Sequence, residues 1–418
     1  MSAPVLFSRL AVSLAVLAIL PPSGRSQGTE PAARSPEFLE TVLQAPALSA
    51  AARRAVAARE RVGAAGKLAD VTVEGMGSRM VGPMDERATM WEVNVRQALP
   101  KRGERAADRE RALAIAAMAE AEYAIMAGEM AADTAMALAE AEGAETRARL
   151  IERQIDRLDA VLRNIESQLA IGNGRIADRL TVQSRIATMQ LMVEEERTMA
   201  ADALAEARGR LGLNPEAALP GFTALPTAEI NADEAAAIHA ASARIEEANA
   251  MAKMARASAK PMTSFGLRFE RERRAMGAAD TLGLAFMTDL PFRSRRYSMA
   301  ENRAADAERT AAKSDASAAR FRISSALSRA ERAERLALTA QRLSKDTLGR
   351  LNAEYDALVQ AAGAGVSKMG ESTILQIVEI LEKTTDTALQ VIQAETAARI
   401  ARAELWRFAP ASHFPTNS

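Results

Sequence analysis

The chain has 418 residues with 54 basic and 54 acidic side chains, so its formal net charge is zero. It has no basic excess to attract nucleic acid, and we expect no nucleic-acid partner. The absence of cysteine excludes disulfides, thiolate metal sites and cysteine nucleophiles. Two histidines are too few for a histidine-rich metal centre. We therefore expect no enzymatic activity, no cofactor and no metal site. Aromatic residues are 4% against 48% hydrophobic residues, which predicts close-packed, alanine-rich long helices rather than a globule.

The N-terminus carries a predicted secretory signal peptide over residues 1–26. Arg9 precedes an apolar run from Leu10 to Leu20, and Pro21-Pro22 follows it. This run is too short to cross a bilayer as a helix, but it suits the h-region of a signal peptide. An ordinary buried N-terminal helix is the alternative interpretation. No later stretch is apolar enough for a transmembrane helix, so any later contact with a membrane needs strands or a surface contact.

Proline spacing divides the rest of the chain into two similar halves. Residues 101–214 and 292–409 contain no proline, and each tract follows a Leu-Pro pair. Interior proline costs a helix about 3 kcal/mol, so such tracts suit long helices. The two prolines lie 191 residues apart (291 − 100), and the same offset relates two pairs of glycines: Gly172, Gly174, Gly363 and Gly365. The repeated offset predicts an internal duplication.

Each predicted repeat contains a helix, a hairpin, a long helix and a return helix. For repeat 1 (27–212) we predict a helix over 37–69, strands at about 70–78 and 90–98, and helices at about 101–170 and 176–212. For repeat 2 (233–410) we predict a helix at about 233–260, strands at about 262–270 and 281–289, and helices at about 292–361 and 371–408. A mid-height linker (213–232) and a C-terminal tail (411–418) complete the division.

The four strands are predicted from apolar residues that alternate with polar or small ones between glycine and proline breaks. The apolar positions are Val71, Val73, Trp91, Val93, Val95, Phe265, Leu267, Phe269, Leu282, Leu284 and Phe286. The intervening charged or amide positions are Glu74, Glu92, Asn94, Arg96, Arg268 and Glu270. A tilted strand of 9–10 residues spans a bilayer, although a hairpin in water remains an alternative.

Helix lengths predict a stacked arrangement. Apolar residues from Ile151 to Leu169 follow a spacing of 4 and 3, which is typical of a coiled-coil seam. A helix over 101–170 is roughly 105 Å long. The segments 176–212 and 233–260 together come close to that length, as do 371–408 and 37–69, so we expect each of these pairs to stack end to end beside one long helix.

Two local motifs resemble stretches of a known protein family. Val95-Arg96-Gln97-Ala98-Leu99-Pro100-Lys101-Arg102-Gly103-Glu104-Arg105 is similar to a stretch of the CzcC-like, heavy-metal branch of the TolC-like outer-membrane efflux protein family. Leu290-Pro291-Phe292-Arg293-Ser294-Arg295-Arg296 resembles that family's entry to its second long helix. With the duplicated helix–hairpin–helix–helix order, the resemblance covers essentially the whole mature chain.

The resemblance implies a mainly α protein with four β-strands per chain. As a homotrimer it would form a 12-stranded outer-membrane β-barrel on a long periplasmic α-helical barrel. The apolar strand positions would then face lipid, and the polar ones would line the lumen. The implied partners are outer-membrane lipid, a periplasmic adaptor (membrane fusion) protein and a proton-driven inner-membrane transporter. The basic residues of the two motifs would lie near lipid phosphates or simply solvate the helix starts.

The resemblance also implies sites at the far helical end. Adaptor docking falls on the two turns, at Gly172, Gly174, Arg175, Gly363, Gly365 and Val366. A tip constriction falls on Glu379, Gln376, Glu371 and Asp178, where Gln376 replaces the first acid of the family pattern. Ordinary turn glycines and solvated helix faces are the alternatives. For the whole chain, the sequence favours an efflux exit duct over a periplasmic coiled-coil scaffold or adaptor without a barrel.

Overall fold

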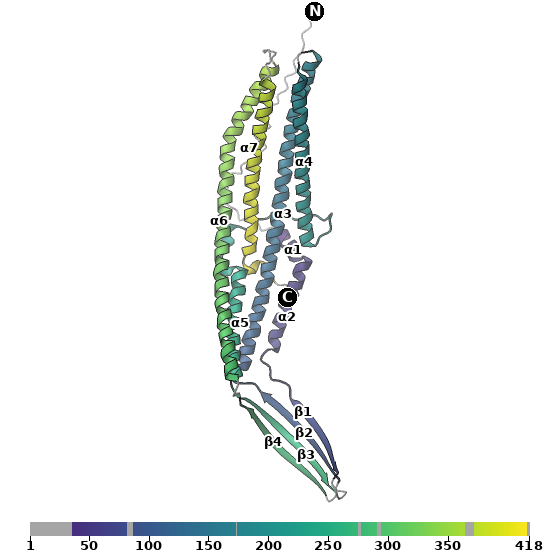
Figure 1. The fold of residues 1–418 in the computed structure, drawn as a ribbon, viewed down its shortest axis with the longest axis vertical. Helices are drawn as coiled ribbons and strands as arrows, with labels where there is room; N and C mark the ends of the chain where they lie inside the picture. The colour runs from purple at the N-terminus through teal and green to yellow at the C-terminus, as the bar shows by residue number, and fades with distance from the viewer. Residues whose placement is uncertain are drawn as a thin grey trace, which may run out of the picture.

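The chain forms a long helical shaft with a sheet at one end (Figure 1). The computed structural model describes residues 36–81, 87–172, 174–274, 277–290, 294–363 and 372–415. The predicted signal peptide, residues 1–26, lies outside this range. Among the helices of the described ranges, none is both long and apolar enough to cross a membrane.

Two long helices run the length of the shaft. Helix α3 (Glu104–Ala170) has 67 residues and α6 (Ser294–Gly363) has 70, so they measure roughly 100 and 105 Å. Helix α3 starts three residues after the predicted position of about 101 (104 − 101), and residues 291–293, before α6, lie outside the described residues. The return helices are α4 (Ile176–Leu211) and α7 (Ser372–Ala403), and a 3₁₀ turn, η3 (Glu404–Phe408), continues α7. The half nearest the sheet holds α2 (Pro46–Ala64) and α5 (Ala236–Ser258).

The short helices stack in columns, but the predicted pairing was wrong. Gly212, which ends α4, lies against Pro46 at the start of α2. Ala235, just before α5, forms a β-bridge with Pro410, just after η3. Figure 1 accordingly shows α4 above α2 and α7 above α5. Length matching could not distinguish these columns from the predicted ones, because the four short helices offer more than one sum close to a long helix.

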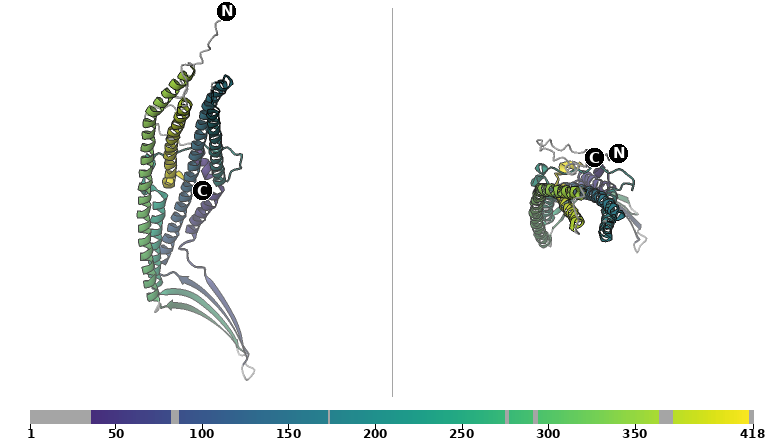
Figure 2. Two further views of the ribbon diagram at one scale, coloured as in Figure 1. Left: turned by 45° about the horizontal axis from the view of Figure 1, so that its top comes forward. Right: turned by 90° about the horizontal axis from the view of Figure 1, so that it is seen from above.

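Helix α3 lies between the two columns, and α6 packs against the α7–α5 column. Seen along the shaft in Figure 2, the helices follow an arc rather than a closed bundle. One lateral edge of the arc is α6, and the other is the α4–α2 column. A single chain therefore leaves two helical edges without a neighbour.

The predicted first helix is broken in two. Helix α1 (Pro36–Leu43) ends before Pro46, which opens α2 at its first position. Proline lacks the N–H that a helix interior needs, but it fits the first helical turn. The prediction of one helix across 37–69 gave this proline too little weight.

The sheet has the order β1-β2-β3-β4, and every neighbouring pair is antiparallel. Its strands are β1 (Thr72–Val81), β2 (Arg87–Leu99), β3 (Met262–Arg274) and β4 (Gly277–Asp289). Three of them have 13 residues, longer than the predicted 9–10. The alternation of apolar and polar residues covers only part of each strand. The backbone hydrogen bonds between the strands continue beyond it, so the strands are longer than the alternation predicts.

The largest hydrophobic cluster lies at mid-height, where the columns meet. Trp406 is 2% exposed, its ring centroid is 5.8 Å from that of Phe38, and its Nε1 donates a hydrogen bond of 2.9 Å to the carbonyl of Thr223. Phe414 is also buried here. Ala411 and Phe414 of the expected C-terminal tail therefore belong to this core. Sequence pattern gave no sign of this, because the segment has no helical or strand periodicity.

Candidate functional site

The sheet has one apolar face that is open to the surroundings. Cross-strand partners share a face, and the register places Val95 beside Leu267, and Leu267 beside Leu284. The same face carries Val73, Trp91, Val93, Phe265, Phe269, Leu282 and Phe286. Val71 precedes the first strand and is also exposed. Leu284 is 88% exposed, so these side chains have no core of their own to fill.

Aromatic side chains lie toward both ends of this apolar face. Trp91 is near the turns, and Phe265 and Phe286 form an edge-on pair with ring centroids 5.2 Å apart near the helices. From Leu99 to Trp91 the strand advances eight residues, or roughly 26 Å. This is the length of a strand that crosses a bilayer at a tilt, and the aromatic borders match those of the outward-facing band of a membrane barrel.

The opposite face of the sheet is polar and held by ion pairs. Arg268 Nε lies 3.0 Å from Glu92, and its Nη2 lies 3.2 Å from Glu270. Arg96 lies 2.6 Å from Glu74. Asn94 shares this face, opposite Glu74 on one side and Arg268 on the other. All six residues predicted as polar alternates therefore gather on one face.

The sheet is open at both edges. β1 and β4 are its outer strands, and within the described residues no other strand pairs with their free sides. Unpaired N–H and C=O groups are tolerated in water but cost several kcal/mol each in hydrocarbon. If the apolar face lies in lipid, the edges require pairing with another copy of the sheet.

The turn that connects α3 to α4 at the far end of the shaft depends on its glycines. Gly172 has φ = 80°, and a Cβ on Gly174 would lie 2.6 Å from the backbone N of Leu169. Arg175 is exposed and directly precedes α4. The two glycines are thus required by the turn itself, whatever else binds there.

The second turn is described only at its start. Gly363 is the last residue of α6. The other predicted docking residues, Gly365 and Val366, and the tip acid Glu371 lie outside the described residues. The predicted docking site on the second turn therefore stays a prediction.

Of the described tip residues, Gln376 and Glu379 are exposed and Asp178 is half-buried. Gln376 and Glu379 are exposed on α7, whereas Ile377 and Val378 between them are buried. Glu379 accepts a 2.7 Å hydrogen bond from Lys383 Nζ, and this bond raises the pKa of Lys383. Asp178 lies in the first turn of α4. The Lys383 partner, one turn from Glu379, was readable from the sequence spacing but was missed.

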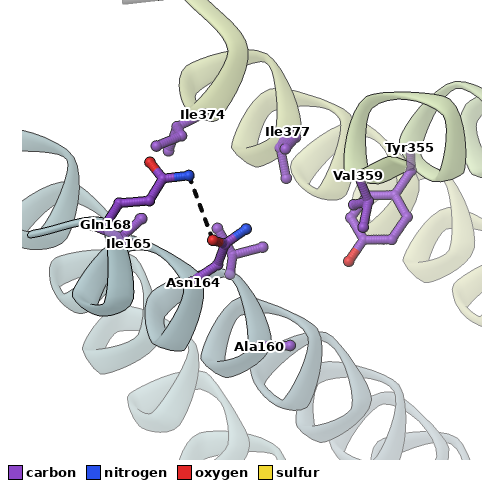
Figure 3. A pocket seen from close by; sticks show the side chains of 9 residues that line it. Ala160, Asn164, Ile165, Gln168, Tyr355, Val359, Ile374 and Ile377 are labelled. Carbon is purple, nitrogen blue, oxygen red and sulfur yellow. Dashed lines mark hydrogen bonds between the residues drawn. The ribbon is translucent and has the colours of Figure 1, made fainter. Parts of the chain in front are cut away.

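A small apolar pocket near the tip lies between α3 of one helical hairpin and α6 and α7 of the other. In Figure 3, Gln168 and Asn164 on α3 face Ile374 and Ile377 on α7, and Gln168 donates a 3.5 Å hydrogen bond to Asn164. Tyr355 on α6 also lines it, and burial raises the pKa of its phenol. The sequence gave no sign that Tyr355 would lie next to α3.

No site in the described part of the chain suggests catalysis or a bound metal. Among those residues, no group of three or more His, Asp or Glu side chains could hold a metal ion.

Comparisons with solved structures identify the architecture. Vibrio cholerae outer membrane protein VceC superposes with a TM-score of 0.73 at 14% identity, over 90% of this chain and 96% of that one. A Pseudomonas aeruginosa membrane protein gives 0.72 at 18% identity, over 89% of each chain. The open-state outer membrane channel MtrE of Neisseria gonorrhoeae gives 0.67 at 16%, over 91% and 90%. No protein-family model matches the sequence, and no curated protein does.

The fold is that of the TolC-like outer-membrane channels. The likeness extends over the shaft and the sheet together, since about nine-tenths of the chain is covered. The TolC-like fold accounts for the mainly α composition and the four antiparallel strands. At these identities it establishes architecture, and individual residue roles rest on the geometry above.

Proposed function

We propose that the chain is the outer-membrane exit duct of a tripartite efflux system. It passively carries substrates from an inner-membrane pump across the periplasm and the outer membrane, without catalysis. The observation that carries this proposal is the exposed apolar face of the sheet, backed by an ion-paired polar face and bordered by two open edges. A periplasmic scaffold would have no use for such a face, because exposed apolar patches in water promote association.

The open edges favour a homotrimer. Four strands from each of three copies would close one 12-stranded barrel, with β1 of one copy beside β4 of the next. The lateral helices support the same arrangement, because each carries large apolar side chains that are more than half exposed in one chain. These are Phe321, Leu336 and Leu343 of α6, and Leu180 and Leu191 of α4. A neighbour's edge helix would cover them, closing the arc of Figure 2 into a tunnel.

The remaining assignments follow from this arrangement. Residues 1–26 direct export, the two repeats with their mid-height linker span the periplasm, and the helical turns with Gly172, Gly174 and Arg175 meet the adaptor. Glu379 lies near the tunnel tip, where three copies would attract cations. The pump is a proton-driven inner-membrane transporter. The motif from Val95 to Arg105 favours heavy-metal cations as cargo.

Single cysteines test the barrel directly, because the natural chain has none. In outer-membrane vesicles, a membrane-impermeant thiol reagent should label Ala285→Cys, on the polar face, but not Leu284→Cys, on the apolar face. Ala285 and Leu284 are adjacent on β4, so depth and expression are matched. After extraction, the protein should migrate as a trimer in gel filtration with light scattering.

Equal labelling of both cysteines would contradict lipid contact by the apolar face. A monomer that is soluble without detergent would overturn the duct and favour the scaffold.

A further inference from the structure

We propose that the junction between shaft and sheet binds the phosphate headgroups of anionic phosphoglycerides in the periplasm-facing leaflet. This assignment presupposes the membrane insertion proposed above and goes beyond it by naming a lipid class and the residues that hold it. The junction is called the collar and comprises the described residues 65–71, 100–109, 259–261, 289–290 and 294–297. In Figure 1 it lies where the strands meet the ends of α2, α3, α5 and α6.

The collar is basic although the whole chain is neutral. Its cations are Lys67, Lys101, Arg102, Arg105, Arg109, Lys260, Arg295 and Arg296. Its carboxylates are Asp70, Glu104, Asp108 and Asp289. The collar therefore carries an excess of positive charge in each copy, and threefold repetition would turn this excess into a ring.

Two of the four carboxylates are already engaged with backbone groups. Glu104 Oε2 accepts a 2.8 Å hydrogen bond from the N–H of Lys101, and Asp108 Oδ2 accepts one of 2.8 Å from the N–H of Gly66. Gly66 has φ = 69°, and a Cβ there would lie 2.7 Å from the carbonyl oxygen of Arg105, so the contact requires glycine. The acids fix the loop before β1 instead of neutralising the surrounding cations.

The cations line a shallow groove between the end of α2 and the start of α3. Lys67, Arg105 and Arg109 surround it, and Gly63 and Ala106, which lack bulky side chains, form part of its wall. Arg105 Nε donates a 2.6 Å hydrogen bond to the carbonyl of Gly66, which holds the guanidinium at the groove. Within the described residues, no carboxylate forms an ion pair with Lys67 or Arg109. The groove thus presents fixed positive charge around a space without bulky side chains.

The collar lies at headgroup depth. Arg102 is three residues beyond Leu99, the last apolar-face residue of β2, which is about 10 Å along the chain. Leu68, next to Lys67, is 51% exposed and can enter the hydrocarbon boundary. Basic side chains at such a boundary lay their stems on apolar surface and their charges among phosphates. An anionic diacyl lipid satisfies both parts of this surface, which free phosphate does not.

The test uses the detergent-solubilised trimer and measures the melting temperature by circular dichroism. Short-chain phosphatidylglycerol should raise it more than phosphatidylcholine at equal concentration, because a ligand of the folded state stabilises by mass action. Lys67→Gln/Arg102→Gln/Arg109→Gln should weaken the apparent phosphatidylglycerol affinity about 100-fold, at about fivefold per cation. The matched control is Arg153→Gln/Arg163→Gln/Arg342→Gln, which removes three exposed shaft cations and should behave as the natural chain.

Each alternative result has a separate meaning. Equal effects of the two lipids, or equal losses in both triple variants, would overturn the collar assignment. A shift produced equally by inorganic phosphate would show a free-anion site and also overturn it. Reconstitution in vesicles of phosphatidylcholine alone or with phosphatidylglycerol tests the duct separately. Failure to insert in either would overturn the duct, whereas insertion without any lipid preference would overturn only the collar.

Discussion

The shaft and the sheet each contain one tryptophan, and the two are used in opposite ways. Trp406 is 2% exposed at mid-height of the shaft, whereas Trp91 is 62% exposed on the sheet. In the shaft, large apolar side chains fill a core formed by α1, α3 and the segments that follow α4 and α7. In the sheet, the same kind of side chain points outward. This difference is what the proposed duct requires, with water around the shaft and hydrocarbon around the sheet.

The largest expected effect is the difference in folding stability between alanine variants of the two tryptophans. Trp406→Ala should destabilise the folded chain by about 3–5 kcal/mol, because it empties a packed core and removes the hydrogen bond to Thr223. Trp91→Ala should change stability in detergent far less. Urea unfolding followed by circular dichroism measures both. Similar losses for the two variants would show that the exposed face also packs against protein.

The second comparison stays within the sheet and contrasts its faces. Leu284→Arg should cost about 2–4 kcal/mol of stability in a bilayer, because it places a charge on the lipid face. Thr281→Arg should be tolerated, since Thr281 lies on the polar face directly opposite Glu270. The measurement is reversible unfolding from lipid vesicles. Equal tolerance of both arginines would remove the distinction between the faces.

The third comparison returns to the shaft and the sheet and concerns one glycine in each. A Cβ on Gly128 of α3 would lie 2.8 Å from the carbonyl oxygen of Trp406, whereas a Cβ on Gly283 of β4 would meet nothing within 4 Å. Gly128→Ala should therefore destabilise by about 1–3 kcal/mol through overpacking. Gly283→Ala should be neutral or stabilise by up to about 1 kcal/mol. Thermal melts of the two variants compare them, and a tolerated Gly128→Ala would mean that α3 and the C-terminal segment are further apart than described.

The smallest effect concerns pH and reports on the shaft alone, because all three tyrosines lie on its helices. Burial raises the pKa of Tyr355, while the guanidinium of Arg157, 5.8 Å from the ring centroid, acts in the opposite direction. The unfolded chain thus loses this proton at lower pH than the folded chain. Stability should decline as the pH rises above about 10, and less so in Tyr355→Phe. Absorbance titration at alkaline pH should show a smaller late phase in that variant, and the late phase that remains belongs to Tyr123, whose pKa burial also raises.

Local chemistry made much of the architecture predictable. The proline-free tracts around the two long helices, and the alternation in the four strands, are short-range patterns set by backbone hydrogen bonding and side-chain period. The apolar positions from Val73 to Phe286 fall on one face because a strand alternates sides at every residue. The glycines at 172 and 174 mark a turn because larger residues do not fit there.

Tertiary structure decided which distant segments meet. The sequence did not show that α4 stacks on α2, because helices of similar length are interchangeable in a length sum. It did not place Trp406 against Phe38, or Phe414 in the same core, since these contacts join the two ends of the chain. It also gave no sign that Glu104 and Asp108 engage backbone N–H groups and leave the collar basic. Apart from the local contact between Glu104 and Lys101, these pairings join segments that are far apart in the sequence, and no local period encodes them.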